Sequence, residues 1–223
     1  MATILILETA TKVCSVALAK DGQLVAIQEA HEERFTHAEN LNVFVAEVLK
    51  LAGSDFKDLD AIAVSGGPGS YTGLRIGVSA AKGYCHALNI PLIAVDTLRA
   101  MASGVEIESG VIIPMIDARR MEVFCSVFDK DHNELEAVSA AVLDENSYSQ
   151  YSDHTIYLLG DGATKFTDLN KALTTVNLYQ YPSAGSMISL VETAYKQQIF
   201  VDTAYYEPFY LKDFVAGKPK KMI

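Results

Sequence analysis

The fold of this chain is decided by the stretch Ser65-Gly66-Gly67-Pro68-Gly69-Ser70-Tyr71-Thr72-Gly73-Leu74-Arg75. An apolar run over residues 61–64 precedes it and predicts a short buried strand. A helix pattern follows, in which Leu74, Val78 and Ala81 share one face at a period of 3.6 residues. The stretch is therefore predicted to be a strand-to-helix turn. Its glycines and exposed amides could hold a phosphate, or it could be a tight connection that needs Gly and Pro for its backbone dihedrals and binds nothing.

Composition indicates a globular, acidic protein. The 223 residues are 50% hydrophobic and 21% charged, so the chain can bury a substantial core in one large domain or two small ones. The net charge of −10 argues against direct binding of nucleic acid, and we expect a partner to hold any RNA that the protein serves. Lys212, Lys218, Lys220 and Lys221 are expected to lie on a solvated C-terminal tail.

The cysteines and the N-terminal sequence bear on location. Cys14, Cys85 and Cys125 lack the paired spacing of a zinc or redox site, which predicts reduced core residues. The first residues lack the basic region of a signal peptide, and Glu8 interrupts their apolar run. Because no apolar stretch has membrane-spanning length either, we expect a cytoplasmic protein without a membrane contact.

The first half of the sequence predicts the order β-β-β-α-β-α-β-α. Three strand-like runs over 3–7, 13–19 and 23–30 are followed by a helix with the capping-box spacing of Thr36 and Glu39. That helix carries an apolar stripe made of Leu41, Phe44, Val45, Val48 and Ala52. The strand over 61–64, the helix after the glycine turn, a strand over 91–95 and a short helix from residue 96 complete the order.

The second half is predicted to repeat this order. The expected elements are strands over 111–116, 122–128, 135–143 and 155–159, and helices over 144–150 and 183–200. This is the order of the ribonuclease H-like half that, used twice, builds the superfamily of actin, sugar kinases and chaperone ATPases. The prediction is therefore an α/β protein with two ribonuclease H-like lobes of the actin-like ATPase type. The lobes are expected to span residues 1–104 and 105–223, with the tail packing back on the first.

A nucleotide cleft is the first candidate site that this fold suggests. In the superfamily, an acidic residue at the end of the first strand and a Gly-rich turn behind it hold magnesium and the phosphates. The corresponding residues here are Glu8, Thr9, Gly67, Gly69, Ser70, Asp117, Gly160 and Gly162. No glycine follows Glu8, so tight ATP binding is not expected and the cleft is interpreted as vestigial. The alternative is a polar strand end capped by threonine hydroxyls.

Hydrolase and metal chemistry find no support in the motifs. Ser65 and Ser70 have no neighbouring base, and no Gly-x-Ser-x-Gly elbow is present. The five histidines are scattered, without a pair at i, i+4. His37 lies in the first turn of a helix and is expected to be solvated.

The helix after the glycine turn carries a second face of small residues, formed by Gly73, Gly77, Ala80, Ala81 and Tyr84. Each interior glycine costs a helix about 1 kcal/mol relative to alanine. We therefore expect a close neighbour on this face. It is the helix over 41–52 of the same chain, the same surface of a second chain, or both.

Three parts of the sequence resemble the TsaB (YeaZ) family. They are Ile4-Leu5-Ile6-Leu7-Glu8-Thr9-Ala10 with Cys14-Ser15-Val16-Ala17-Leu18, the segment from Gly67 to Gly77, and Ile116-Asp117-Ala118-Arg119 with Glu122-Val123. The resemblance implies a non-catalytic subunit of the bacterial machinery that installs threonylcarbamoyladenosine next to the anticodon of tRNA. In that machinery the paralogue TsaD transfers the threonylcarbamoyl group, TsaB dimerises with TsaD, and the ATPase TsaE joins them. The sequence departs from the family pattern at Glu8, where Asp is usual, and at Arg120-Met121.

A comparison with the catalytic paralogue separates partner from enzyme. TsaD carries a metal-binding His-x-x-x-His in the short helix after the strand that corresponds to 91–95. Here Thr97 and Met101 stand in the two histidine positions, and a hydroxyl and a thioether do not replace two imidazoles. The resemblance thus implies no catalytic residues, no metal and no intrinsic cofactor, with ATP and magnesium bound only weakly or through the complex. The alternative is a weak ATPase or phosphotransferase that uses Glu8, Asp117 and the glycine turn.

The family also pairs subunits through the two helices of the first lobe. The matching interface residues here are Leu41, Phe44, Val45, Val48, Gly77, Ala80, Ala81 and Tyr84. This surface is expected to bind a TsaD-like paralogue and to form a homodimer when the protein is alone. The tRNA is expected to be reached indirectly, through the complex.

Overall fold

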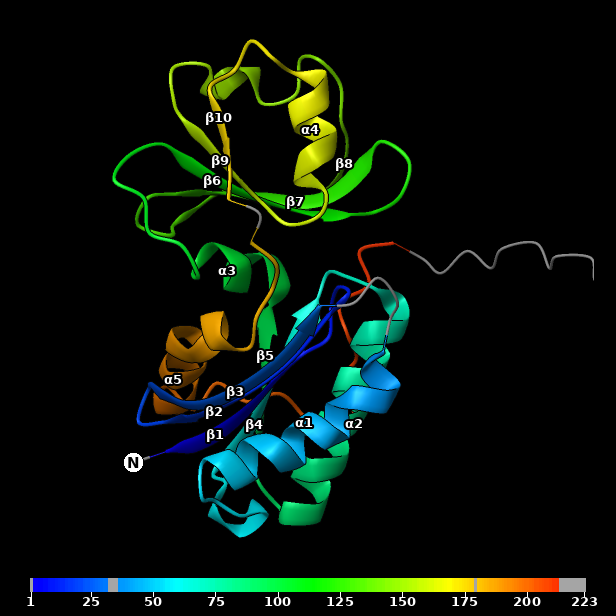
Figure 1. The fold of residues 1–223 in the computed structure, drawn as a ribbon, viewed down its shortest axis with the longest axis vertical. Helices are drawn as coiled ribbons and strands as arrows, with labels where there is room; N and C mark the ends of the chain where they lie inside the picture. The colour runs from blue at the N-terminus through cyan, green and yellow to red at the C-terminus, as the bar shows by residue number, and fades with distance from the viewer. Residues whose placement is uncertain (1, 32–35, 179, 213–223) are drawn as a thin grey trace, which may run out of the picture.

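The computed structural model describes residues 2–31, 36–178 and 180–212. Lys218, Lys220 and Lys221, which were expected on a solvated tail, lie outside these ranges. The chain forms two lobes, each built on a five-stranded mixed sheet (Figure 1). Cys14, Cys85 and Cys125 are buried, as predicted, and none of the three forms a disulfide. None of the helices within the described ranges is long and apolar enough to cross a membrane.

The first sheet has the strand order β3-β2-β1-β4-β5. β1 (Thr3–Glu8), β2 (Val13–Lys20) and β3 (Gln23–His31) form an antiparallel meander. β4 (Ala61–Gly67) pairs parallel with β1, and β5 (Leu92–Asp96) pairs parallel with β4. Every residue of β1 and β4 is buried, which is typical of central strands covered on both faces.

Helices cover both faces of this sheet (Figure 1). On one face lie α1 (His37–Leu51) and α2 (Tyr71–Leu88), separated in sequence by the short 3-10 helix η1 (Phe56–Asp58). Their apolar stripes, including Leu41, Val45 and Val78, pack on the side chains of Leu5 and Leu7. The short helix α3 (Thr97–Ala102) and α5 (Ile188–Lys196) lie on the opposite face.

The second lobe repeats the topology of the first. β6 (Val111–Asp117), β7 (Glu122–Asp129) and β8 (Glu134–Val142) are antiparallel, while β9 (Ile156–Leu159) and β10 (Thr175–Asn177) continue the sheet in parallel from β6. α4 (Ala163–Leu169) packs on this sheet through Phe166. The order β10-β9-β6-β7-β8 mirrors that of the first sheet, and the predicted fold of two ribonuclease H-like lobes of the actin-like type is confirmed.

The extent of the second lobe needs a correction. Residues 105–223 were expected to form it, with the tail packing back on the first lobe, yet the chain already returns to the first lobe soon after β10. Ala184, Met187, Ile188 and Val191 are buried against the first sheet, on the face opposite α1 and α2. The physical reason is that this apolar sheet face needs a covering layer, and α5 supplies it.

Three local predictions also differ from the structure, and two short elements were missed. Thr36 makes no capping hydrogen bond, and its Oγ1 accepts from Asn40 Nδ2 at 3.0 Å. Residues 144–150 form turns that lead into the 3-10 helix η2 (Ser149–Tyr151), because Asp144 Oδ1 accepts from the backbone N–H of Asn146 and competes with helix formation. The helix over 183–200 shortens to α5, preceded by the 3-10 helix η3 (Gly185–Met187). The short elements α4 and β10 were not predicted.

Candidate functional site

The first half of the predicted cleft lies at the carboxyl end of β1. Glu8 is fully buried there, and its Oε1 accepts from the backbone N–H of Ala10 at 2.5 Å. Burial raises the pKa of Glu8 to about 7, against the opposing effect of hydrogen bonds from Ala10, Ser65 and Thr9. A carboxyl group enclosed in this way is not presented to solvent as a magnesium ligand would be.

The glycine turn connects β4 to α2, as predicted, and the amides of Ser70 and Gly73 are already hydrogen-bonded within the chain. Ser70 is the N-cap of α2, and its Oγ accepts from the backbone N–H of Gly73 at 3.3 Å. The backbone N–H of Ser70 donates to the carbonyl of Ala10 at 2.6 Å. A Cβ on Gly69 would lie 2.5 Å from that same carbonyl oxygen. The chain's own backbone therefore fills the place where a phosphate would sit, which favours a tight connection over a phosphate cradle.

The small face of α2 has its close neighbour within the chain. Thr9 Oγ1 donates to the carbonyl of Gly73 at 2.8 Å, and a Cβ on Gly77 would overlap Thr9 Oγ1. The turn after β1 thus packs directly on the first half of α2. These two glycines are explained without a second helix or a second chain.

His37 was expected to be solvated, and this expectation is wrong. The ring is 1% exposed, and its Nε2 lies 2.7 Å from the carbonyl oxygen of Thr11. Burial lowers the pKa of His37, although the hydrogen bond to Thr11 acts in the opposite direction. The neutral ring joins the beginning of α1 to the turn that holds Glu8 and Thr9.

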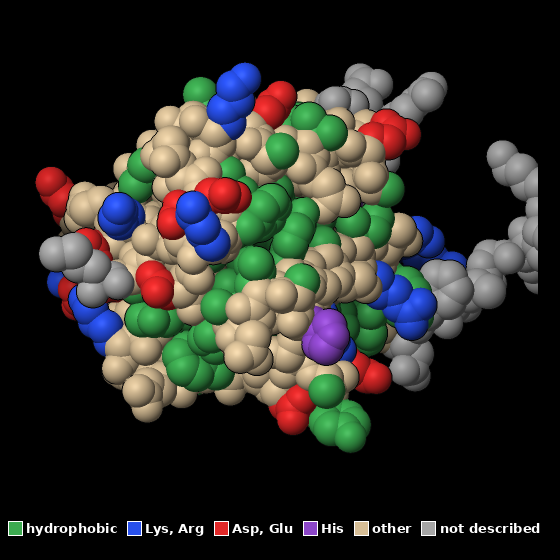
Figure 2. Space-filling view, turned by 90° about the horizontal axis from the view of Figure 1, so that it is seen from below, with side chains coloured by type: hydrophobic (Ala, Val, Ile, Leu, Met, Phe, Trp, Pro, Cys, Tyr) green, Lys and Arg blue, Asp and Glu red, His purple; other side chains and the backbone are tan. Residues whose placement is uncertain are grey.

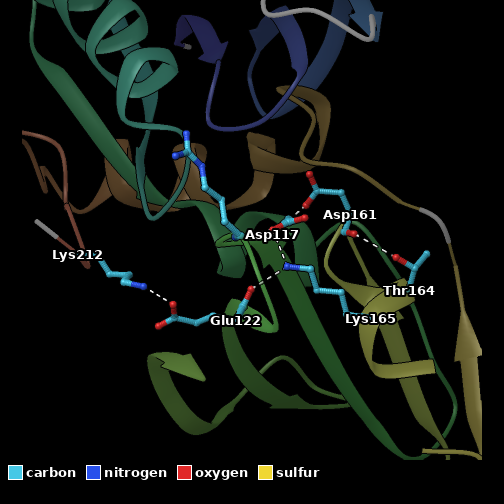
Figure 3. Close-up of polar contacts among 7 residues, drawn as sticks. Asp117, Glu122, Asp161, Thr164, Lys165 and Lys212 are labelled. Atoms are coloured by element: carbon cyan, nitrogen blue, oxygen red, sulfur yellow. Dashed lines mark hydrogen bonds and ion pairs between the residues drawn. The ribbon is translucent and has the colours of Figure 1, made fainter. Parts of the chain in front are cut away.

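The second half of the cleft lies at the end of β6, where Figure 3 shows a chain of polar contacts. Lys165 Nζ pairs with Asp117 Oδ1 at 2.6 Å and donates to the carbonyl of Glu122 at 3.1 Å. The backbone N–H of Asp117 donates to Asp161 Oδ1 at 2.8 Å. Burial raises the pKa of Asp161, although the hydrogen bond from the backbone N–H of Asp117 acts in the opposite direction.

The glycines beside Asp161 are also engaged by the chain itself. The backbone N–H of Gly160 donates to the carbonyl of Gln180 at 2.7 Å, and that of Gly162 donates to the carbonyl of Met115 at 3.0 Å. A Cβ on Gly160 would overlap the Met115 carbonyl. This loop serves a close backbone packing, as the glycine turn of the first lobe does.

The two positions that replace the paralogue's histidines lie in the core. Thr97 and Met101 are fully buried on α3, and Met101 joins an apolar cluster with Leu98 and Ile116 at the junction of the lobes. Over residues 2–31, 36–178 and 180–212, no three His, Cys, Asp or Glu side chains are grouped so that they could hold a metal ion.

The structure divides the predicted partner surface into buried and exposed parts. Its buried members pack within the chain, so they are corrected to core residues: Leu41, Val45, Val48, Gly77 and Ala81. Their stripe is the one that attaches α1 and α2 to the sheet. Phe44, Ala80 and Tyr84 are only partly buried. The Tyr84 hydroxyl donates to Asn42 Oδ1 at 2.8 Å, and its ring stacks on Phe56 at a centroid distance of 5.5 Å.

Two exposed apolar residues on α1 were not predicted as part of this surface. Val43 is 52% exposed and Leu51 is 64% exposed. Both residues lie outside the buried stripe of α1. Apolar residues at such positions were the signal in the sequence that could have indicated an exposed contact surface. Viewed from below, toward the ends of α1 and α2, hydrophobic side chains gather in the middle of the face with charged residues around them (Figure 2).

Comparison with known proteins places these features in a family. A family model described as TsaD, tRNA N6-adenosine threonylcarbamoyltransferase, matches residues 31–152. The tRNA threonylcarbamoyladenosine biosynthesis protein TsaB of Escherichia coli is 32% identical over 96% of each chain. YeaZ from Pseudomonas aeruginosa superimposes with a TM-score of 0.78 at 28% identity, covering 95% of this chain and 100% of that one. The tRNA N6-adenosine threonylcarbamoyltransferase of Bacillus subtilis is 28% identical over 62% of this chain and 44% of its own length.

Proposed function

The chain belongs to the TsaB (YeaZ) family, and we propose that it serves tRNA threonylcarbamoyladenosine biosynthesis as a non-catalytic subunit that binds a TsaD-type transferase. The observation that carries the role in this pathway is the identity to the E. coli protein along nearly the whole chain. The family model describes the transferase itself, so the residues of the chain have to distinguish the subunit from the enzyme.

Three structural features support a non-catalytic role. Thr97 and Met101 are core residues where the transferase is expected to carry two metal-binding histidines. Glu8 is enclosed by the protein, and the carbonyl of Ala10 in the turn that follows it accepts from the backbone N–H of Ser70 in the glycine turn. Among the described residues, the side chains at the two histidine positions and at the first half of the cleft are not placed to bind a metal ion or a phosphate, which supports the proposed non-catalytic role.

The partner surface is proposed on the exposed sides of α1 and α2. Its members are Phe44, Ala80 and Tyr84, together with Val43 and Leu51 on α1. Exposed apolar side chains on two adjacent helices favour packing against helices of another subunit. Through this surface we propose binding to the TsaD-type paralogue and self-association when the paralogue is absent. A TsaE-type ATPase and the tRNA would then join this cytoplasmic complex without an RNA site on this acidic chain.

A reconstituted modification reaction tests the proposal. A TsaD-type transferase, a TsaE-type ATPase, their substrates and unmodified tRNA are incubated with and without this chain, and threonylcarbamoyladenosine is measured by mass spectrometry of the digested tRNA. The product is expected only when the chain is present. Equal yields without the chain would contradict the proposed role, and product formation by the chain without the transferase would contradict its non-catalytic character.

A further inference from the structure

The segment 201–212, here called the strap, leaves α5 and runs from the first lobe to the second. The backbone N–H of Val201 donates to the carbonyl of Leu92 at 2.9 Å, which joins the strap to the edge of the first sheet. Farther along, the backbone N–H of Phe209 donates to the carbonyl of Gly66 at 2.7 Å. At its end, Lys212 pairs with Glu122 on β7 of the second lobe (Figure 3). One continuous segment therefore contacts both lobes.

The seat of the strap on the first lobe is built by side chains of α2. Lys82 Nζ donates to the carbonyls of Ala204 and Tyr206 at 3.1 and 3.0 Å. Arg75 Nε donates to the Tyr210 hydroxyl at 3.2 Å, and the Tyr210 ring lies 4.8 Å from the ring of Tyr71. These contacts hold the strap at two separate points along the helix.

Two glycines of the turn make room for the strap. A Cβ on Gly66 would overlap the hydroxyl of Tyr206, and a Cβ on Gly67 would lie 2.5 Å from the carbonyl oxygen of Phe209. Gly67 also has a φ of +112°, a backbone conformation that glycine tolerates best. The strap thus accounts for the two glycines that the packing of Thr9 and Ala10 leaves unexplained.

The anchor on the second lobe is part of a larger polar network. Glu122 receives Lys212 through its side chain and Lys165 through its carbonyl, and Lys165 in turn pairs with Asp117 at the end of β6. The strap is thereby connected to the strand end that bears the second half of the vestigial cleft.

A separate contact joins the lobes through α3. Arg99 Nη2 pairs with Glu134 Oε2 at 2.9 Å, and its guanidinium lies 5.3 Å from the centre of the Phe128 ring. In Figure 1 the end of the strap, in red, and α3 lie at different places along the junction of the lobes. Because these two attachments lie apart, together they restrict a rotation of one lobe against the other that either attachment alone would permit.

We propose that the strap is an intramolecular clamp that fixes the angle between the two lobes. It bridges the lobes with residues of the chain itself, and it places the carbonyl of Phe209 against the glycine turn, where it repels an incoming anion. Removing the clamp should leave both sheets folded and widen the range of angles that the lobes sample.

Distances between spin labels on the two lobes test the clamp. Lys57 and Lys171 are exposed, one on each lobe, and the three native cysteines are buried, so labels at Lys57→Cys and Lys171→Cys report the angle. The full chain should give a narrow distance distribution, and a chain that ends at Asp202 should give a broad one. A narrow and unshifted distribution for the folded, truncated chain would overturn the proposal.

Charge reversal tests the anchor on the second lobe without shortening the chain. Lys212→Glu should increase the fraction of molecules whose label-to-label distance lies outside the main peak about two- to fivefold. This is the effect expected for the loss of a partly exposed ion pair. Adding Glu122→Lys should restore the distribution. Lys130→Glu is the control, because Lys130 pairs with its neighbour Asp131 within the second lobe. Broadening that the second reversal does not rescue would contradict a clamp acting through this pair.

Two alanine variants test the seat on the first lobe. Gly66→Ala should displace Tyr206 and broaden the distribution, whereas adding Tyr206→Phe removes the overlapping hydroxyl and should narrow it again. Gly83→Ala is the matched control, since nothing lies within 4 Å of its added Cβ. Circular dichroism verifies that each variant is folded. Equal distributions for Gly66→Ala and Gly83→Ala would refute the seat.

Discussion

Replacing Glu8 by glutamine should stabilise the protein at neutral and alkaline pH and flatten the dependence of its stability on pH. The wild-type carboxyl is fully buried at the end of β1, and burial raises its pKa from 4.5 to about 7. Glutamine has nearly the same shape and keeps an oxygen that accepts from the N–H of Ala10. The variant therefore removes the buried charge and keeps the turn.

The size of this effect follows from proton linkage. Below pH 4.5 the carboxyl is protonated in both the folded and the unfolded protein, and its ionisation costs no stability. As the pH rises from 4.5 to about 7, the unfolded protein loses the proton first, so the free energy of unfolding falls. Above about pH 7 the whole cost remains. At about 1.36 kcal/mol for each unit by which the folded and unfolded pKa values differ, the cost of the buried charge is roughly 3 kcal/mol.

Urea unfolding at several pH values measures the difference. Glu8→Gln should exceed the wild type by roughly 3 kcal/mol in the free energy of unfolding at pH 8, and by much less at pH 4.5. Glu108→Gln, at an exposed position, is the control for the loss of one charge. If the free energies of unfolding of the wild type and Glu8→Gln changed with pH in parallel, the pKa of Glu8 would not be raised in the folded protein.

Gly77→Ala should lower the free energy of unfolding by about 1–3 kcal/mol because the new Cβ meets Thr9. Gly83→Ala in the same helix places its Cβ in open space and should raise the free energy of unfolding by up to about 1 kcal/mol. Thermal unfolding measures both effects, and equal effects would contradict the packing of Gly77 on Thr9. His37→Asn should reduce the loss of stability as the pH falls below 6.5, because the buried ring, with its lowered pKa, favours the neutral form; unchanged melting curves between pH 5 and 7 would refute this. Calorimetric titration with magnesium-ATP should show no saturable binding, and micromolar affinity with turnover would favour a phosphotransferase.

The sequence was sufficient for the strands of both sheets other than β10, because these strands are short apolar runs bounded by turn residues. It was not sufficient where tertiary contacts decide the structure. Residues 144–150 have a helix-like pattern, but Asp144 satisfies backbone amides locally and ends the pattern in turns. The return of α5 to the first lobe depends on which apolar sheet face lacks a cover, and periodicity along the chain does not contain that information.

The candidate site was predictable as a location but not as a chemical environment. Sequence order placed Glu8 and the glycine turn together, as the structure has them. It did not show that the carbonyl of Ala10 and the side chain of Thr9 fill the space beside α2, because these contacts arise only when β1 and α2 are packed. Likewise, one apolar stripe on α1 combined buried Val45 with partly exposed Phe44, and only the packed structure separates them.

The most direct test of the account is whether this chain binds a TsaD-type paralogue through α1 and α2. In size-exclusion chromatography of an equimolar mixture, the wild-type chain should elute with the paralogue. Ala80→Arg should elute separately while remaining folded, because a long cationic side chain blocks close helix packing. Ala137→Arg, at an exposed position on β8, should behave like the wild type. Separate elution of the wild-type chain, or complex formation by Ala80→Arg equal to that of Ala137→Arg, would contradict the account.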